Sequence, residues 1–287
     1  MKIGIIDVGT NAARLLIEEI SVPTRNKIYY TRIPLRLGDD VYSNGLISAQ
    51  KTTDFIQTIQ AFALICKSFH VDQIKAVATS AMRDAANANE IIGLIKDQTA
   101  VELEVITGEE EANYILEAFS TLDINKSIPF MVIDVGGGST EISVFENGNR
   151  TASRSFELGT LRLLNNKEHM DIWDSLTQWI QEKIPVKAPL ILYGTGGNIG
   201  KAHKVLNLKN SDSATFSALQ ELHNALNSLS LEERIRKYPL KKDRADVIVP
   251  AIEIYLFIMK VLDQTEIFVP KIGLADGIIN SITNSTK

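Results

Sequence analysis

The sequence contains two short segments in which an apolar run ends in an aspartate and is followed by a glycine-containing turn. One of them is Met131-Val-Ile-Asp-Val-Gly-Gly-Gly-Ser-Thr-Glu-Ile-Ser-Val-Phe145. Consecutive glycines leave backbone N–H groups that no Cβ shields, so an anion can approach them closely. Asp134 and Glu141 flank these glycines, and carboxylates beside phosphates are a common way to hold Mg²⁺. The segment predicts a phosphate-plus-metal site in a hairpin turn; the alternative is an ordinary glycine-rich hairpin.

The second segment lies near the N-terminus and favours the first of these interpretations. Ile5-Ile-Asp-Val-Gly-Thr-Asn11 is similar to Val132-Ile-Asp-Val-Gly-Gly-Gly138, and the two aspartates are 134 − 7 = 127 residues apart. That spacing is the size of a domain. One glycine-rich hairpin is weak evidence for a binding site, but two at domain spacing predict a pair of facing phosphate loops.

Three further segments carry residues that could do chemistry. Each follows a predicted strand, and the polar groups of such sheets gather at strand ends. They are Thr79-Ser-Ala-Met-Arg83, Gly108-Glu-Glu-Glu111 and Gly194-Thr-Gly-Gly-Asn198. The last two can also be purely structural, because the helix dipole favours glutamates in a first turn and a glycine cluster allows close helix–strand packing. From the residues alone, the choice among the three glutamates stays open.

The elements expected around these segments define the fold class. The first half alternates from three strands into helix, strand, helix, strand and helix, and this order favours an α/β protein with sheets covered by helices. A polar stretch at 121–129 ends the first half, and the second half repeats the order apart from a helical insertion at about 206–262. We expect two domains, 1–122 and 123–287, each a mixed sheet of βββαβαβα order, with a cleft between them. We leave open that the last helix packs back on the first domain.

Composition narrows the classes of function. The net charge of −5 disfavours nucleic-acid binding, and no apolar run is long enough for a membrane span. The single cysteine, Cys66, excludes an intramolecular disulfide and a cysteine-rich zinc site and fits a cytoplasmic protein. The stretch Lys237–Arg244, with Arg234 and Arg236 before it, is locally basic. It is either a solvated helix face or a path for a long anion.

Six segments carry a resemblance to a known family, in the same order along nearly the whole chain. They are Asp7-Val-Gly-Thr-Asn11 with Arg14, Arg36-Leu-Gly38, Ala78-Thr-Ser-Ala-Met-Arg83, Ile106-Thr-Gly-Glu-Glu-Glu-Ala112, Asp134-Val-Gly-Gly-Gly-Ser-Thr-Glu141 and Gly194-Thr-Gly-Gly197. Together they resemble the exopolyphosphatase/guanosine pentaphosphate phosphohydrolase (Ppx/GppA) family, in its short two-domain form. That family belongs to the actin–hexokinase–Hsp70 superfamily, so the resemblance implies two actin-like (ribonuclease H-like) domains.

The resemblance also implies residue roles. Glu111 matches the catalytic base, Arg83 a catalytic phosphate contact, and Asp134 and Glu141 the carboxylates that hold Mg²⁺ or another divalent cation. The implied phosphate-binding residues are Asp7, Gly9, Thr10, Asn11, Arg14, Gly136, Gly137, Gly138, Ser139, Thr140, Gly196 and Gly197.

The expected function is hydrolysis of terminal orthophosphate from inorganic polyphosphate or guanosine pentaphosphate, by Mg-assisted attack of water with a glutamate base. Asn198 and Ala275-Asp276 depart from the family pattern. They keep open a non-catalytic sensor that binds polyphosphate or guanosine tetraphosphate. A small-molecule kinase of the same superfamily is a third alternative, which the Glu111 motif disfavours. No nucleic-acid or membrane partner is expected, and a homodimer is left open.

Overall fold

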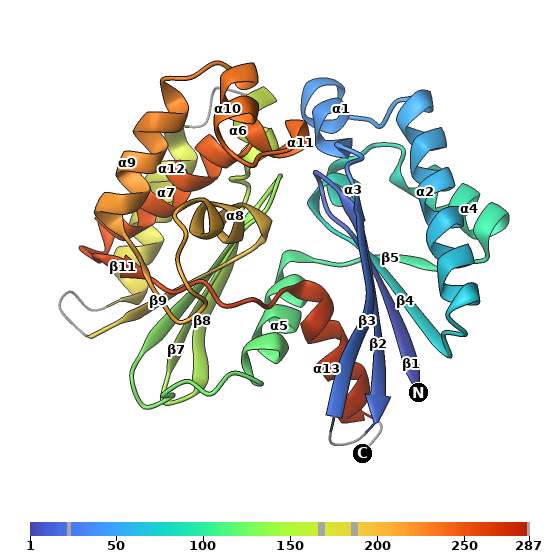
Figure 1. The fold of residues 1–287 in the computed structure, drawn as a ribbon, viewed down its shortest axis with the longest axis horizontal. Helices are drawn as coiled ribbons and strands as arrows, with labels where there is room; N and C mark the ends of the chain where they lie inside the picture. The colour runs from blue at the N-terminus through green and yellow to red at the C-terminus, as the bar shows by residue number, and fades with distance from the viewer. Residues whose placement is uncertain (22–23, 166–169, 185–188, 286–287) are drawn as a thin grey trace. The chain divides into compact units, whose positions relative to one another are not determined.

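The computed structural model describes residues 1–21, 24–165, 170–184 and 189–285. The chain forms two compact units (Figure 1): unit 1 comprises Met1–Ser120 and Leu274–Lys287, and unit 2 comprises Thr121–Gly273. The predicted boundary after residue 122 lies close to the first crossing between the units. The last helix, expected in the second domain with allowance for packing on the first, belongs to unit 1. The predicted cleft between the domains stays a prediction.

Unit 1 is built on a mixed sheet of strand order β3-β2-β1-β4-β5. Its strands are β1 (Lys2–Val8), β2 (Ala13–Ser21), β3 (Thr24–Ile33), β4 (Gln73–Ala78) and β5 (Leu103–Val105). Its helices are α1 (Leu37–Asn44), α2 (Ala49–Ser68), α3 (Ser80–Asp84), α4 (Ala88–Thr99), α5 (Gly108–Phe119) and α13 (Leu274–Ser285). Strands β1 to β3 pair antiparallel, whereas β4 and β5 run parallel to β1. The first loop and the starts of α1 and α3 therefore meet at one end of this sheet.

Helix α2 shows why the sequence predicts elements of this unit well. Ser48 caps the helix, and its hydroxyl accepts a hydrogen bond from the Lys51 amide. Phe55, Ile59 and Phe62 recur in the sequence at spacings of four and three, which predicts one buried helix face, and all three side chains lie in the core of unit 1. The predicted buried face is therefore confirmed, because a 3.6-residue period places these side chains on one side of the helix.

Helix α13 crosses α5 at very close range, and glycine makes this possible. A Cβ built on Gly277 would lie 1.6 Å from the carbonyl oxygen of Tyr114, which is backbone of α5. No side chain fits there without moving one helix. This contact accounts for the return of the C-terminal segment to unit 1, where α13 lies beside α5 (Figure 1).

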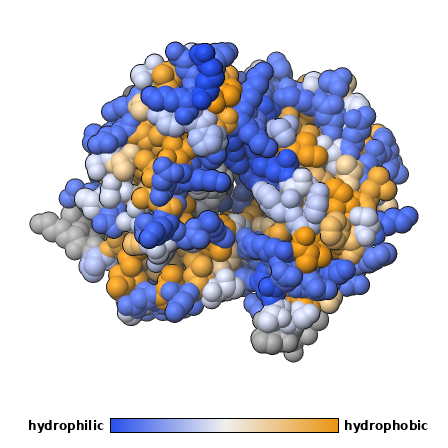
Figure 2. All heavy atoms as spheres, in the orientation of Figure 1, coloured by the Kyte–Doolittle hydropathy of each residue, from blue (hydrophilic) through white to orange (hydrophobic). Residues whose placement is uncertain are grey.

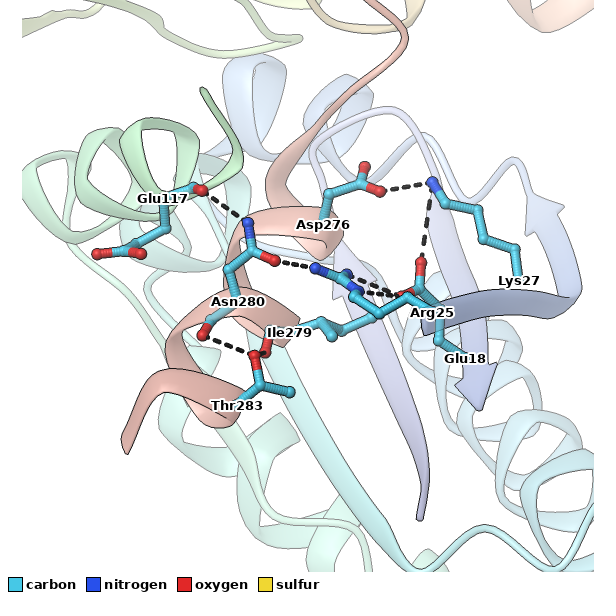
Figure 3. Close-up of polar contacts among 8 residues, drawn as sticks. All are labelled: Glu18, Arg25, Lys27, Glu117, Asp276, Ile279, Asn280 and Thr283. Atoms are coloured by element: carbon cyan, nitrogen blue, oxygen red, sulfur yellow. Dashed lines mark hydrogen bonds and ion pairs between the residues drawn. The ribbon is translucent and has the colours of Figure 1, made fainter. Parts of the chain in front are cut away.

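Polar contacts fix α13 to the strands of the same unit (Figure 3). Asp276 forms an ion pair with Lys27, and the side-chain oxygen of Asn280 accepts a hydrogen bond from Arg25. The Asn280 amide group also donates to the backbone carbonyl of Glu117 on α5, at 2.7 Å. Because Asn280 is buried, these bonds satisfy a side chain that would otherwise destabilise the packing.

Unit 2 is built on a mixed sheet of order β8-β7-β6-β9, with a separate pair of β10 and β11. The strands are β6 (Phe130–Val135), β7 (Thr140–Glu146), β8 (Asn149–Phe156), β9 (Ile191–Thr195), β10 (Ala214–Thr215) and β11 (Glu266–Ile267). The helices are α6 (Thr160–Asn165), α7 (Met170–Lys183), α8 (Gly197–Val205), α9 (Phe216–Asn227), α10 (Leu231–Lys237), α11 (Lys242–Ala245) and α12 (Ile248–Val261). The predicted α/β class with two mixed sheets is therefore confirmed.

The two faces of the unit 2 sheet differ in character. Met131, Ile133 and Leu192 point to the core that contains α12, together with the fully buried Tyr255. Because side chains alternate along a strand, the residues between them point to the opposite face. There the rings of Phe130 and Tyr193 meet edge to face. That face also carries Asp134, so the core face supports the strands while the other face carries the polar groups.

The face of the molecule drawn in Figure 2 is mixed in character. Figure 2 shows hydrophilic side chains interspersed with hydrophobic ones over the visible face. Among the described residues, no helix has the length and apolar character needed to cross a bilayer.

Candidate functional site

The repeat seen in the sequence is a repeat of backbone structure. We call Gly9–Ala12 loop 1 and Gly136–Ser139 loop 2. In loop 1 the Gly9 N–H donates to the Ala12 carbonyl at 3.0 Å, and in loop 2 the Gly136 N–H donates to the Ser139 carbonyl at 2.9 Å. Each loop connects the first two strands of its unit. The same turn is therefore built twice, once at the end of each sheet.

Helix α6 orients the backbone of loop 2. The Leu161 amide donates to the carbonyl of Gly137 at 2.7 Å, and the Arg162 side chain donates through Nε to the carbonyl of Gly138 at 2.8 Å. Among the described residues, no protein group accepts a hydrogen bond from the backbone amide of Gly137 or Gly138. With its carbonyls held by the helix, loop 2 has amide groups available to bind an anion.

A glycine that the sequence motifs did not single out supports loop 2 from behind. A Cβ built on Gly159 would lie 2.4 Å from both the amide nitrogen and the carbonyl carbon of Gly138. These are backbone atoms that a side chain cannot displace without moving the loop. The contact joins residues far apart in the sequence, so no local pattern could have indicated it.

One row of polar side chains crosses the sheet of unit 2 directly below loop 2. Asp134 is in register with Glu141 on β7 and with Thr195 on β9, and Glu141 is in register with Ser155 on β8. Residues paired across strands share a face of the sheet. The Ser155 hydroxyl donates to the Glu141 carboxylate at 2.8 Å. We call these four residues the carboxylate row.

The carboxylate row provides two side chains that could hold a divalent cation. Within the described part of the chain, no group of three or more histidine, cysteine, aspartate or glutamate side chains is arranged to hold a metal. Mg²⁺ is commonly bound by one or two carboxylates, with waters and phosphate oxygens as its other ligands. Asp134 and Glu141, adjacent on neighbouring strands, provide those two carboxylates without forming a complete protein cage.

The second glycine cluster lies against the carboxylate row. Gly196 has φ +95°, and a Cβ there would lie 2.6 Å from an oxygen of Asp134. Glycine at this position therefore lets the Asp134 carboxylate approach the start of α8. Arg244 lies over Gly197 and donates to the side-chain oxygen of Asn198 at 2.6 Å. Asn198, a departure from the family pattern, thus has a structural partner within unit 2.

The basic stretch contains residues of different kinds. Arg244 reaches the start of α8. Burial lowers the pKa of Lys201 on that helix, and the charges of Lys204 and Arg244 lower it further. Arg234 instead donates to the backbone carbonyls of Leu226 and Ala245 and supports the fold. A path for a long anion along this stretch stays a prediction.

Tyr255 supports the carboxylate row from the core side of the sheet. Its hydroxyl donates to the Thr195 carbonyl at 2.6 Å and accepts a bond from the Val135 amide at 3.3 Å. Burial raises the pKa of Tyr255 well above its usual value, and the charges of Asp134 and Glu141 raise it further. Tyr255 therefore stays a neutral donor that joins the ends of β6 and β9. The sequence carried no signal for this role.

Unit 1 has a different charge pattern at the same place in its sheet. Asp7 is in register with Arg14, and their side chains form an ion pair at 2.5 Å. Arg14 is in turn in register with Arg32 on β3. The predicted phosphate-binding residues Asp7 and Arg14 therefore lie together, but the carboxylate of Asp7 contacts an arginine instead of a second carboxylate.

Hydroxyl groups anchor loop 1 to helix α3. The Thr10 hydroxyl lies 3.0 Å from that of Ser80 and accepts a bond from the Ala81 amide at 3.3 Å. Tyr42 contacts the Ser80 hydroxyl from α1, also at 3.0 Å. Because Arg83 lies on the same short helix, this contact ties the position of loop 1 to that of a predicted catalytic side chain.

The structure distinguishes the three glutamates at the start of α5. Glu110 forms a capping box with Thr107, and hydrogen bonds from the Thr107 amide and hydroxyl hold the pKa of Glu110 below its usual value. Glu109 is exposed. Glu111 is half-buried and pairs with Arg83 at 3.1 Å, and Arg83 is itself held by the Ile106 carbonyl at 2.7 Å. The two residues predicted to be catalytic are thus brought together.

Thr140, a predicted phosphate contact, has a hydrogen-bond partner within the fold. Its hydroxyl donates to the Leu158 carbonyl at 2.5 Å, and its side chain is buried. In this structure the hydroxyl proton therefore stabilises the connection between β7 and α6, and the phosphate contact stays a prediction.

The comparisons with known proteins agree with the fold. The model of the Ppx/GppA phosphatase family matches residues 25–286, which is most of the chain. The chain belongs to the Ppx/GppA phosphatase family.

Individual relatives support this assignment. The chain is 32% identical over 166 residues to exopolyphosphatase 1 of Mycobacterium tuberculosis, a match that covers 57% of this chain and 48% of the relative. The chain thus spans about half the length of the curated relatives it matches.

Solved structures show the same fold. A crystal structure of an exopolyphosphatase from Cytophaga hutchinsonii matches with a TM-score of 0.87 and 22% identity, covering 100% of this chain and 99% of that one. A Bacteroides thetaiotaomicron protein of actin-like ATPase fold and unknown function matches with a TM-score of 0.50 and 11% identity, covering 98% and 95%. At these identities the likeness shows the fold alone, which is actin-like.

Proposed function

We propose that this chain is a phosphoanhydride hydrolase that releases terminal orthophosphate from inorganic polyphosphate. Membership of the Ppx/GppA phosphatase family and the relatives named exopolyphosphatases support this substrate class. The structural observation that carries the proposal is the pair of Arg83 and Glu111. This pair places an anionic carboxylate beside a cation at the end of the unit 1 sheet. Such an arrangement suits proton transfer next to a phosphoryl group.

Unit 2 has the groups suited to hold the phosphoryl group. The amides of Gly137 and Gly138 would bind its oxygens, and Asp134 and Glu141 would hold a divalent cation. Mg²⁺, when bound, neutralises part of the negative charge on the phosphate oxygens. Such preorganised donors stabilise the charge of the transition state more than they stabilise the substrate.

Unit 1 supplies the base. Glu111 orients a water molecule and accepts its proton as the water oxygen bonds to the terminal phosphorus. The bond from phosphorus to the bridging oxygen breaks, and the products are orthophosphate and a polyphosphate shorter by one phosphate. Arg83 fixes the Glu111 carboxylate and contributes positive charge beside it.

Guanosine pentaphosphate is a second proposed substrate, because its terminal phosphoanhydride presents the same reacting group. A non-catalytic sensor is less favoured, because the departures from the family pattern that suggested it have roles in the fold. Asn198 binds Arg244, and Asp276 pairs with Lys27 in the packing of α13. The fold therefore gives both residues a role that does not require a change of ligand.

Orthophosphate release from polyphosphate, guanosine pentaphosphate and ATP, measured in parallel with and without Mg²⁺, tests the proposal. We expect release from polyphosphate that depends on Mg²⁺ and little release from ATP. Tight binding of polyphosphate without release would identify a sensor. Consumption of ATP only when an acceptor is present would identify a kinase.

Glu111→Gln tests the role of the base directly. We expect kcat to fall by about 10²–10⁴-fold, the range for loss of a general base, while substrate binding measured by titration is retained. Glu109→Gln is the matched control, because Glu109 lies in the same helical turn but is exposed, and it should keep wild-type kcat. A fully active Glu111→Gln variant would show that another group accepts the proton.

A further inference from the structure

Thr195, at the end of β9, has a hydroxyl group that the fold does not use. Its side chain is 1% exposed, and Oγ1 has no hydrogen-bond partner among the residues that the structure describes. Buried hydroxyls are nearly always paired, because removing such a group from water without a new partner destabilises the protein. The position of this hydroxyl therefore calls for a physical reason.

The strand register shows where Thr195 lies. It is paired with Asp134 on β6, and both residues share the face of the sheet that carries Glu141. The alternate residues, Leu192 and Gly194, lie on the opposite face: Leu192 is part of the core, and Gly194 packs against the ring of Tyr255. The Thr195 side chain therefore belongs to the polar carboxylate row and not to the core that contains α12.

The backbone of Thr195 is held firmly in this position. Its carbonyl accepts the 2.6 Å hydrogen bond from the buried Tyr255 hydroxyl, and its neighbour Gly196 lies against the Asp134 carboxylate. These contacts on both sides of the sheet fix the end of β9 relative to β6. A hydroxyl on such a rigid element is well placed to orient a ligand.

We propose that Thr195 is a positioning residue of the cation site, where its hydroxyl forms a hydrogen bond with a water molecule of a hydrated divalent cation held by Asp134 and Glu141. The proposal rests on the proposed function, which assigns a cation to these two carboxylates. Mg²⁺ gives up its waters reluctantly and keeps several of them when protein carboxylates bind it. Those waters supply the partner that the Thr195 hydroxyl lacks within the described protein, and the bond strengthens cation binding.

Titration of the whole chain with MgCl₂ by calorimetry, without any phosphate substrate, tests this proposal. Thr195→Val removes the hydroxyl at nearly constant shape and should weaken Mg²⁺ binding about tenfold, as loss of a group that orients the ligands of a metal does. Thr195→Ser keeps the hydroxyl and should bind Mg²⁺ within about twofold of wild type. The metal-free melting temperature of Thr195→Val should not fall, because the hydroxyl makes no hydrogen bond within the described fold.

Ser143→Ala is the matched control. Ser143 lies on the same face of β7, two residues beyond Glu141, and its hydroxyl contacts Ser153 at 3.1 Å. This variant should bind Mg²⁺ as the wild type does. If it weakens binding as much as Thr195→Val, the effect is general to the sheet and the proposal is wrong.

Other outcomes also overturn the proposal. Wild-type Mg²⁺ affinity in Thr195→Val, or an equal loss in Thr195→Ser, would show that the hydroxyl does not contact the hydrated cation. If Asp134→Asn and Glu141→Gln leave Mg²⁺ binding unchanged, these two carboxylates do not hold the cation and the proposal is wrong. By contrast, a protein that shows the expected titrations but releases no orthophosphate contradicts the proposed function and leaves the role of Thr195 intact.

Discussion

The two units place residues of opposite charge at the same point of the same turn. The paired residues are seven positions apart in each unit, 14 − 7 in unit 1 and 141 − 134 in unit 2. Asp7 faces Arg14, so the charges cancel, whereas Asp134 faces Glu141, so they add. The backbone of the turn therefore fixes where charge is placed, and one residue decides whether the position suits a cation. We propose a cation site in unit 2 and none at the equivalent place in unit 1.

The loops themselves are also stabilised in different ways. Loop 1 is anchored by the side chain of Thr10, which contacts Ser80 on α3. Loop 2 carries glycine at the equivalent position, Gly137, and its support comes from backbone contact with Gly159 and α6. Loop 1 therefore depends on hydroxyl groups, and loop 2 depends on close packing that keeps its amides unshielded.

The largest expected effect comes from neutralising the residue that differs between the units. Glu141→Gln should lower Mg²⁺ affinity by about 10–100-fold, since the cation loses the charge of one of two carboxylates. Arg14→Gln should leave Mg²⁺ affinity nearly unchanged. It should instead lower the free energy of unfolding by about 1.5–3 kcal/mol, because Asp7 is buried and loses its charged partner. Calorimetric titration and denaturant unfolding measure the two effects.

The Glu141→Gln and Arg14→Gln variants can also contradict the proposed difference in charge between the two units. If Arg14→Gln weakens Mg²⁺ binding as much as Glu141→Gln does, the two rows are not specialised for different charges. If neither variant changes the Mg²⁺ affinity, the cation does not bind at the carboxylate row.

A smaller effect is expected from Gly159→Ala, which tests the support of loop 2. The new Cβ meets the backbone of Gly138, and overpacking of this kind costs about 1–3 kcal/mol of stability. Gly200→Ala is the matched control in the same unit, because a Cβ there meets nothing within 4 Å and the position is inside α8. That variant should be more stable by about 0.5–1 kcal/mol. Thermal unfolding measures both, and equal behaviour of the two variants would contradict the role of Gly159.

Much of this architecture is predictable because its signals are local. The repeat of Asp7 and Asp134, the buried face of α2 and the alternation of strands and helices each occupy a short window of sequence. Side-chain period and glycine clusters report on these features directly. The mixed sheets and the location of the two loops were therefore correctly expected.

The parts that the sequence could not predict depend on distant residues. The choice of Glu111 over its neighbours rests on Arg83, 28 positions earlier, because all three glutamates satisfy the same helix-start preference. Tyr255 meets the Thr195 carbonyl across 60 positions. Gly277 is required only because α5 passes against it. Such contacts have no local pattern, so a resemblance to a family or a structure is needed to find them.

The smallest expected effect concerns the hydroxyl anchor of loop 1. Ser80→Ala removes the 3.0 Å contact with Thr10 and should cost about 0.5–1.5 kcal/mol in the free energy of unfolding. Tyr42→Phe is the matched control, since it removes a contact to the same Ser80 oxygen and leaves Thr10 and Ser80 unchanged.

A double-mutant cycle with Thr10→Val isolates the contact between loop 1 and α3. If Ser80 anchors loop 1 through Thr10, the two substitutions are non-additive by at least about 0.5 kcal/mol, the usual coupling of residues in direct contact. Tyr42→Phe combined with Thr10→Val should be closer to additive. Mg²⁺ affinity should stay at the wild-type value in all of these variants, because they leave Asp134 and Glu141, the proposed cation ligands, unchanged. Additive behaviour of Thr10→Val and Ser80→Ala would mean that backbone contacts hold loop 1, as they hold loop 2, and the difference between the two units would then rest on the charges of the residues that flank the loops.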